Sequence, residues 1–281
     1  VYGISCAGTS TNTISGNTIS NLTNASTNTT TYTVGQIYGI NSTSGANTIG
    51  TNTVRDLTIS NYYTSGSAAI GISQSSTTAA AQTVSGNTIY NISNNNSSFA
   101  GSVVGLYYDG PATASAVFNN FIHDLNLSST NASATLYGIR INNGLTKFSN
   151  NIVSLGKNLS TGYYIYNIYD GSNTTTSVNE FYFNTLYIEG SVSNGTQTAN
   201  LYLNSYNYTP YYPNYRKIQN NILCNSRTNT AGTAIHYNIY TLYGTFFSTD
   251  HNVYYANGTG GKLAYLGGTA VTSLPVLAAQ D

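Results

Sequence analysis

Eight short stretches of alternating apolar and polar residues recur along this chain of 281 residues, each introduced by Asn or, in the last copy, by His. Counted from the first of these residues to the last, the steps are 35, 35, 33, 30, 34, 36 and 31 residues. The eight positions are Asn17, Asn52, Asn87, Asn120, Asn150, Asn184, Asn220 and His251. A period of this length is typical of stacked repeats, in which no single unit can bury its own apolar face.

A second motif repeats with nearly the same period. Glycine follows an aromatic or aliphatic residue at Gly3, Gly39, Gly71, Gly105 and Gly138, with steps of 36, 32, 34 and 33 residues. Each repeat therefore contains at least two short strands joined by turns rich in Ser, Thr, Asn and Gly. Apolar residues at helical spacing are missing, and Thr, Asn and Gly are poor helix formers. These patterns predict an all-β fold, a parallel β-helix (solenoid) of about eight coils that forms one domain over residues 1–281.

In such a solenoid, equivalent side chains of successive coils stack on one another. One aliphatic column is predicted to contain Ile19, Val54, Ile89, Ile122 and Ile152, and a second Leu22, Leu57, Ile92, Leu125 and Leu155. The seven Asn residues of the first motif form a predicted structural ladder, because their amides both donate and accept hydrogen bonds and tolerate turn conformations. A β-sandwich is the alternative fold, but it gives no reason for like residues to recur at a fixed period.

Charge and cysteine content exclude several kinds of partner. Only 6% of the residues are charged, and eight basic residues balance eight acidic ones. Nucleic acid and anionic membranes demand clustered Lys and Arg, which are missing here, and no apolar run approaches the ~20 residues that cross a bilayer. Cys6 and Cys224 lie about six coils apart, roughly 30 Å at the spacing of β-strands, so we expect no disulfide between them. We expect no cofactor.

The chain begins inside the repeat and has no Met. The last copy runs to Gln280 and Asp281 without a recognisable cap, although solenoids need polar caps to stay soluble. We therefore expect an uncapped fragment of a longer chain, with targeting and anchoring signals outside it.

Two phrases resemble a known superfamily. They are Phe181-Tyr-Phe-Asn-Thr-Leu-Tyr-Ile-Glu-Gly190 and Asp250-His-Asn-Val-Tyr-Tyr-Ala-Asn-Gly258. With the recurring Asn-Asn-Ile, they look like right-handed parallel β-helix repeats of the pectate-lyase-like superfamily. More narrowly, they resemble large Thr/Asn-rich secreted surface proteins of Bacteroidetes-type bacteria. The resemblance implies a right-handed helix and an extracellular location. It implies no single activity, because the superfamily includes lyases, hydrolases, adhesins and tailspikes.

The best catalytic candidates are two carboxylates, Asp56 and Asp124, at the same position of coils two apart. Their expected separation of about 9–10 Å lies at the far edge of the spacing in inverting glycosidases. The column Asn21, Asp56, Asn91, Asp124 and Ser154 also fits an exposed polar ladder, and we favour that interpretation over catalysis or calcium binding. The chain has three histidines, His123, His236 and His251, which lie in different coils without carboxylate or thiol partners at ligand spacing, so no metal site is predicted.

Tyrosine is abundant, with 27 copies and no Trp. The Tyr2, Tyr38 and Tyr137 side chains repeat in register and predict a packed aromatic column. Five more lie together in a segment with two prolines, which we expect to protrude and to contact ligands such as glycans: Tyr206, Tyr208, Tyr211, Tyr212 and Tyr215. The alternative is a loop that packs on itself and shields one side of the solenoid.

Taken together, the sequence predicts a non-catalytic, extracellular or cell-surface β-helix segment of an adhesin or filament protein. Its expected partners are glycans or neighbouring copies of itself. Two alternatives stay open. One is a polysaccharide lyase or glycoside hydrolase of the β-helix superfamily, and the other is a self-associating extracellular filament subunit, since open β-helix ends can add further coils.

Overall fold

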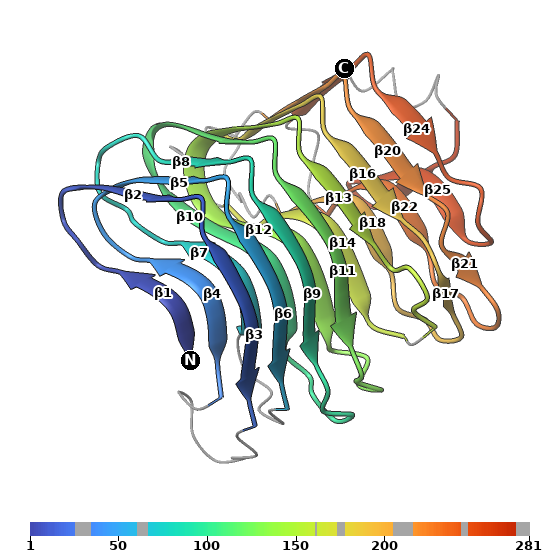
Figure 1. Ribbon diagram of the computed structural model, residues 1–281. Coiled ribbons are helices and arrows are strands. Elements are labelled where there is room, and N and C mark those ends of the chain that lie inside the picture. The colour runs from blue at the N-terminus through green and yellow to red at the C-terminus, as the bar shows by residue number, and fades with distance from the viewer. Residues whose placement is uncertain are drawn as a thin grey trace.

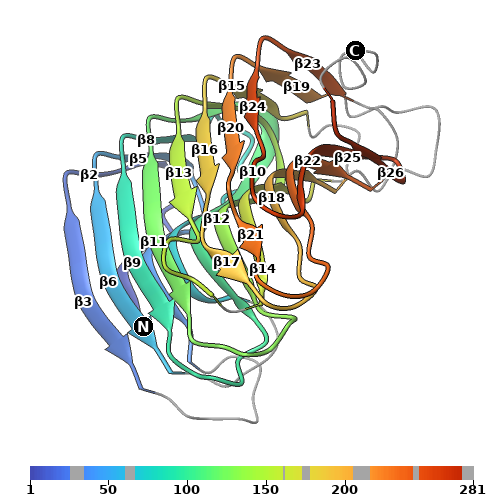
Figure 2. The same ribbon diagram turned by 90° about the vertical axis from the view of Figure 1, so that its right-hand side faces the viewer.

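The computed structural model describes residues 1–25, 35–60, 67–160, 162–172, 178–204, 216–242 and 247–273. Within these residues the chain is all-β and forms a parallel solenoid of about seven turns, close to the eight expected. Most turns contribute up to three strands, and strands of successive turns pair in parallel to form three main stacks. Figures 1 and 2 show the turns following one another in chain order from the N-terminal to the C-terminal end. No helix that could cross a membrane is present in the described residues.

The first stack is the longest. Its strands are β1 (Tyr2–Cys6), β4 (Ile37–Ser42), β7 (Ser67–Gln74), β10 (Ser102–Phe118), β12 (Thr135–Ser149), β14 (Tyr164–Asp170), β18 (Thr198–Leu203), β22 (His236–Thr241) and β25 (Gly261–Leu266). Strand β26 (Thr269–Val271) pairs antiparallel with β25, which changes the strand direction at this end of the stack.

The second stack continues along the chain from the first. Its strands are β2 (Thr11–Ser15), β5 (Ala46–Gly50), β8 (Thr83–Ser85), β15 (Glu180–Tyr182), β19 (Arg216–Gln219) and β23 (Phe247–Asp250). Strands β10 and β12 run through both stacks, because β10 pairs with β7 near its start and with β8 at its end.

The third stack is a separate sheet. Its strands are β3 (Thr18–Asn24), β6 (Thr53–Ile59), β9 (Thr88–Asn94), β11 (Phe121–Leu127), β13 (Ile152–Leu155), β16 (Thr185–Ile188), β20 (Ile222–Asn225) and β24 (Val253–Tyr255). In the later turns, β17 (Ser191–Val192) and β21 (Thr228–Asn229) add a short two-stranded sheet.

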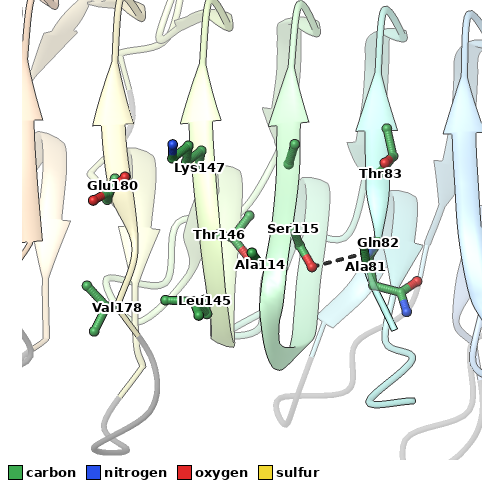
Figure 3. A pocket seen from close by; sticks show the side chains of 11 residues that line it. Ala81, Gln82, Thr83, Ala114, Ser115, Leu145, Thr146, Lys147, Val178 and Glu180 are labelled. Atoms are coloured by element: carbon green, nitrogen blue, oxygen red, sulfur yellow. Dashed lines mark hydrogen bonds between the residues drawn. The ribbon is translucent and has the colours of Figure 1, made fainter. Parts of the chain in front are cut away.

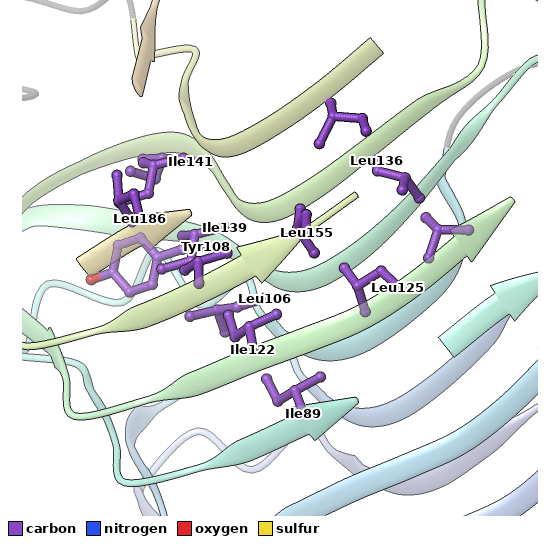
Figure 4. Packing of buried hydrophobic residues seen from close by; sticks show 14 of the residues in the cluster. Ile89, Leu106, Tyr108, Ile122, Leu125, Leu136, Ile139, Ile141, Leu155 and Leu186 are labelled. Atoms are coloured by element: carbon purple, nitrogen blue, oxygen red, sulfur yellow. The ribbon is translucent and has the colours of Figure 1, made fainter. Parts of the chain in front are cut away.

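The core fills the space between the stacks and consists mainly of Ile, Val and Leu. Ile19, Val54, Ile89 and Ile122 are paired neighbours in successive turns, as predicted, and all four are buried. In Figure 4, Ile89, Ile122, Leu125 and Leu155 lie close together with Leu106 and Ile139 of the first stack. Because these side chains point inward in every turn, they form one continuous apolar core along the axis. Burial of apolar surface stabilises the fold by ~25 cal/mol for each Å² removed from water.

The glycines of the second motif lie where the first stack packs against this core. A Cβ atom built on Gly105 would lie 2.5 Å from Cγ2 of Ile122 and 2.7 Å from the carbonyl oxygen of Gly138. Neither approach is sterically possible, and the second atom belongs to the backbone. Glycine recurs at this position because the column of branched residues opposite leaves no room for a side chain.

The Asn ladder contains eight Asn residues of the described part of the chain, one from each successive repeat. The Oδ1 atom of each Asn after the first accepts hydrogen bonds from both the backbone N–H and the Nδ2 group of the Asn one turn earlier, at 2.8–3.1 Å. In seven of the eight ladder residues, Nδ2 also donates to a backbone carbonyl of the preceding turn, as from Asn87 to Ile49 at 3.0 Å. The ladder residues are Asn17, Asn52, Asn87, Asn120, Asn151, Asn184, Asn221 and Asn252.

The predicted ladder positions Asn150 and Asn220 are wrong by one residue, as is the predicted last position, His251. All three adopt a left-handed backbone conformation, with φ of 53°, 59° and 51°, at the turn before the ladder residue. The sequence Asn-Asn offers two Asn residues that suit either position, because Asn tolerates this conformation and also forms side-chain ladders.

The same one-residue shift explains the error at Ile152. Neighbouring residues of a strand point to opposite faces, so a shift of one residue exchanges the buried and exposed sides. Ile152 is paired with Phe121 and is 47% exposed, whereas Val153 pairs with Ile122 and is buried. Ser154 likewise pairs with His123, so it does not belong to the polar column with Asp124.

Candidate functional site

The candidate carboxylates lie on the outer side of the third stack and do not converge. Asp56 accepts hydrogen bonds from Arg55 and Asn91, and Asp124 lies 2.7 Å from Nδ1 of His123. Both aspartates have positive φ values, 56° and 50°, as do Asn21 and Asn91 in the same row. Asp and Asn recur here because they tolerate the left-handed conformation better than other side-chain-bearing residues. In the described residues no group of three His, Cys, Asp or Glu side chains could hold a metal ion.

The five tyrosines of the predicted ligand-binding segment, Tyr206, Tyr208, Tyr211, Tyr212 and Tyr215, lie outside the described residues. The structure instead gathers other tyrosines on the outer face of the first stack. We call this surface the tyrosine face, and its residues are Tyr107, Tyr137, Tyr164, Tyr166, Tyr169, Tyr202, Tyr237, Tyr240 and Tyr265.

The centre of the tyrosine face is a row of stacked rings. Tyr169, Tyr202, Tyr240 and Tyr265 are paired neighbours in successive turns. Their ring centroids are 5.0, 4.7 and 4.8 Å apart and their ring planes differ by 17°, 13° and 7°. Each inner ring is covered by its neighbours on both faces. A ligand approaching from the solvent therefore meets ring edges and hydroxyl groups, one from each turn.

Burial strengthens the preference of these phenols for the neutral form. It raises the pKa of Tyr166 well above its usual value and, together with neighbouring Tyr240 and Tyr265, raises the pKa of Tyr237 to about 12. Burial also raises the pKa of Tyr202, with Tyr240 as the next contribution. A neutral phenol both donates and accepts hydrogen bonds, so the row presents groups of both kinds.

The predicted aromatic column of Tyr2, Tyr38 and Tyr137 is only partly formed. The Tyr2 and Tyr38 rings stack, with centroids 5.2 Å apart. Ile70 and Val104 follow at this position in the next two turns and separate Tyr38 from Tyr137. The aromatic surface is therefore concentrated in the later turns, where sequence spacing alone did not place it.

Arg140 lies at the edge of the tyrosine face, in the same row as Tyr107 and Tyr169. Its Cζ atom is 5.2 Å from the ring centroid of Tyr137 and 5.9 Å from that of Tyr107, within reach of cation–π attraction. Two surface hollows, of about 370 and 210 Å³, meet at Arg140. The larger is lined mainly by hydroxyl and amide side chains, among them Asn41, Ser73 and Ser75.

A third hollow, of about 410 Å³, lies on the outer side of the second stack. Figure 3 shows its lining residues arriving from four successive turns, with Ala81, Ala114, Leu145 and Val178 forming an apolar row beside Lys147 and Glu180. The Glu180 carboxylate forms an ion pair with Lys217, with Nζ 3.2 Å from Oε1. Beneath the hollow, the backbone N–H of Gln82 donates to Oγ of Ser115 at 3.1 Å. Both residues are buried and belong to a polar column.

A buried histidine lies behind the tyrosine face. His236, at the start of β22, is fully buried, with Nδ1 3.0 Å from Oγ1 of Thr198 and Nε2 3.0 Å from Oδ1 of Asn229. Burial, and secondly the charge of Arg227, lower the pKa of His236 to about 4. Burial also lowers the pKa of Arg227, to about 10. Both ring nitrogens of His236 are occupied by protein neighbours, which favours a structural role.

This histidine predicts a pH-dependent stability. The unfolded-state pKa of His is about 6.5, so the lower folded-state pKa contributes stability that is complete above pH 6.5 and is lost as the pH falls towards 4. The loss amounts to roughly 3 kcal/mol at about 1.4 kcal/mol per pKa unit. We expect His236→Gln to flatten the decline in urea midpoint between pH 7.5 and 4.5. The control His123→Gln, at a partly exposed position, should keep the decline. An equal slope in both variants would contradict the assignment.

Comparison with family models, with curated proteins and with solved structures found no match to this chain.

Proposed function

We propose that this chain is a structural and adhesive segment of an extracellular surface or filament protein, and that it contacts glycans through the tyrosine face. The observation that carries the proposal is the position of Arg140, where two hollows meet beside aromatic rings. Sites for sugars combine apolar walls with a few fixed polar groups. Here the phenol hydroxyls and the guanidinium supply the polar groups, and the tyrosine rings supply the walls.

The architecture supports the structural part of this proposal. Backbone ladders, the Asn ladder and stacked tyrosines all run along the same axis, so most buried polar groups of the described residues are hydrogen-bonded. A rod of this kind resists local opening and proteolysis. The balanced charge limits long-range electrostatic attraction or repulsion between whole molecules. A right-handed helix sense and a relationship to pectate-lyase-like β-helices and Thr/Asn-rich surface proteins of Bacteroidetes-type bacteria belong to the same proposal.

Arg140→Ala tests the glycan contact. A charge-assisted hydrogen bond is worth about 1.5–3 kcal/mol, so we expect the variant to bind its glycan about 10- to 100-fold more weakly in titrations against a panel of neutral and acidic polysaccharides. Lys157→Ala removes an exposed lysine elsewhere and should leave binding unchanged. Both variants should melt close to the unmodified protein.

Two results would overturn the proposal. One is the absence of binding to every polysaccharide of the panel when its binding sites are present at ~1 mM, a concentration that detects even weak interactions. The other is the release of new reducing ends or unsaturated products during incubation, which would favour a lyase or hydrolase instead.

A further inference from the structure

An exposed apolar stripe runs along the outer face of the third stack, away from the tyrosine face. Phe121, Ile152, Thr185, Ile222 and Val253 are paired neighbours in five successive turns. The four apolar members are 40%, 47%, 48% and 58% exposed, in chain order. In the three earlier turns the same position is occupied by Thr18, Thr53 and Thr88. The stripe is therefore confined to the later turns.

The flanking rows extend the apolar surface. Phe183, in the turn before β16, is 57% exposed, and Tyr255, two residues after Val253, is 51% exposed. Six of the nine exposed large hydrophobic residues in the described part of the chain belong to this face. Contiguous exposed apolar surface of this kind marks interaction sites on soluble proteins.

The order of residues along the stripe is symmetric about Thr185. Ile152 and Ile222 lie one turn to either side, and Phe121 and Val253 lie two turns to either side. A two-fold axis running along β16, between two copies placed face to face, would bring each residue opposite its counterpart. Ile152 would face Ile222 of the partner copy, Phe121 would face the smaller Val253, and Thr185 would face Thr185. An isologous interface of this type closes on itself.

The size and charge of the face suit such a pairing. Five strands at ~4.8 Å and five residues at ~3.3 Å give roughly 400 Å² of flat area on each copy, before side-chain relief is counted. The total of about 800–1,000 Å² lies at the lower end for specific interfaces, which corresponds to a weak, reversible dimer. The stripe itself carries no charged residue, and the whole chain is neutral, so two copies do not repel each other.

We infer that the apolar stripe is a lateral docking surface for a second copy of this chain, which joins two solenoids side by side with opposite axial directions. We assign the partner as a second copy because the order of side chains along the stripe is symmetric. The stripe therefore matches an identical stripe that runs in the opposite direction. This inference is independent of glycan contact, since it uses the opposite stack.

A charge-swap experiment tests the symmetry directly. Sedimentation of the unmodified protein between ~5 and ~200 µM should show a monomer–dimer equilibrium, as expected for a small interface. Ile152→Lys and Ile222→Glu should each weaken the dimer at least tenfold, because each places an unpaired charge against an apolar residue. The double variant should recover most of the dimer, because the introduced lysine of one copy then faces the introduced glutamate of the partner copy.

Thr18→Lys is the matched control, since it adds the same charge in the same row outside the stripe. It should leave the dimer intact. A monomer at every concentration, a double variant no better than either single variant, or equal disruption by Thr18→Lys would each overturn the inference. Ile152 and Ile222 are exposed and lie two turns apart within one chain, so we expect neither substitution to disturb the fold. Unchanged melting temperatures of the variants would confirm this.

Discussion

We expect Asp170→Asn to lower the free energy of unfolding by about 3–5 kcal/mol, the usual cost of removing one partner from a buried ion pair. Asp170 ends β14 and Arg216 begins β19, and both side chains are almost completely buried. Nε of Arg216 donates to Oδ2 of Asp170 at 2.6 Å. Replacing the carboxylate by an amide leaves the guanidinium charge inside the solenoid without its counter-ion.

The surrounding hydrogen bonds increase the expected effect. Oδ1 of Asp170 accepts from the backbone N–H of Ser172 at 3.0 Å and from Nδ2 of Asn179 at 3.2 Å. Nη2 of Arg216 donates to the carbonyl oxygen of Ser172 at 2.9 Å. An Asn side chain at position 170 has one acceptor oxygen for these donors, so at least one buried group loses its partner.

Urea denaturation of three variants checks this prediction. Asp124→Asn makes the same chemical change at an exposed aspartate with positive φ, where Asn is equally well tolerated, and should change stability by less than ~0.5 kcal/mol. The double variant Asp170→Leu/Arg216→Met should be more stable than Asp170→Asn, because it leaves no buried charge and the neighbours of residue 170 are Ile141 and Leu203. Equal stability of Asp170→Asn and Asp124→Asn would show that the pair contributes little.

We expect Asn87→Ala to be similarly damaging, with a loss of about 3 kcal/mol or more. The substitution removes the acceptor for the backbone N–H and Nδ2 of Asn52. It also removes the donor to Oδ1 of Asn120 and to the carbonyl oxygen of Ile49. Each buried polar group left without a partner costs about 1–3 kcal/mol. Asn52, Asn87 and Asn120 are almost completely buried, so bulk water does not replace the lost hydrogen-bond partners.

Hydrogen exchange gives this prediction a local readout. Because each turn of a solenoid contacts only its neighbours, the amide of Asn52 should lose protection while the amide of Asn221 keeps it. Asn126→Ala, at an exposed position of β11, is the control and should alter neither stability nor exchange by a measurable amount. Uniform loss of protection along the whole chain would mean that the ladder acts as one cooperative unit.

The period of the repeat was sufficient to predict the fold class and most of the core. Parallel pairing of like residues follows from a repeat of about one turn, and Ile19, Val54, Ile89 and Ile122 lie in the predicted column. The register was less certain wherever two Asn residues are adjacent. At Asn150-Asn151 and Asn220-Asn221 either residue suits the turn and the ladder, so only the backbone conformation distinguishes them.

The surfaces proposed for binding depend on how the turns are placed in space. Tyr169, Tyr202, Tyr240 and Tyr265 are far apart in the sequence and occur among many other tyrosines, so no local pattern marks them as one row. The pairing of Asp170 with Arg216 was equally hidden, because the two residues are separated by 46 positions and belong to different strand stacks.

The spacing of the repeats is enough to specify a β-solenoid, because side chains that recur once per turn can be buried only by stacking on their own copies. Which residues face outward together becomes visible only in the folded arrangement of the turns. That choice depends on single left-handed residues at the turns and on the one-residue register that they set, and a shift of one residue exchanges the two faces of a strand.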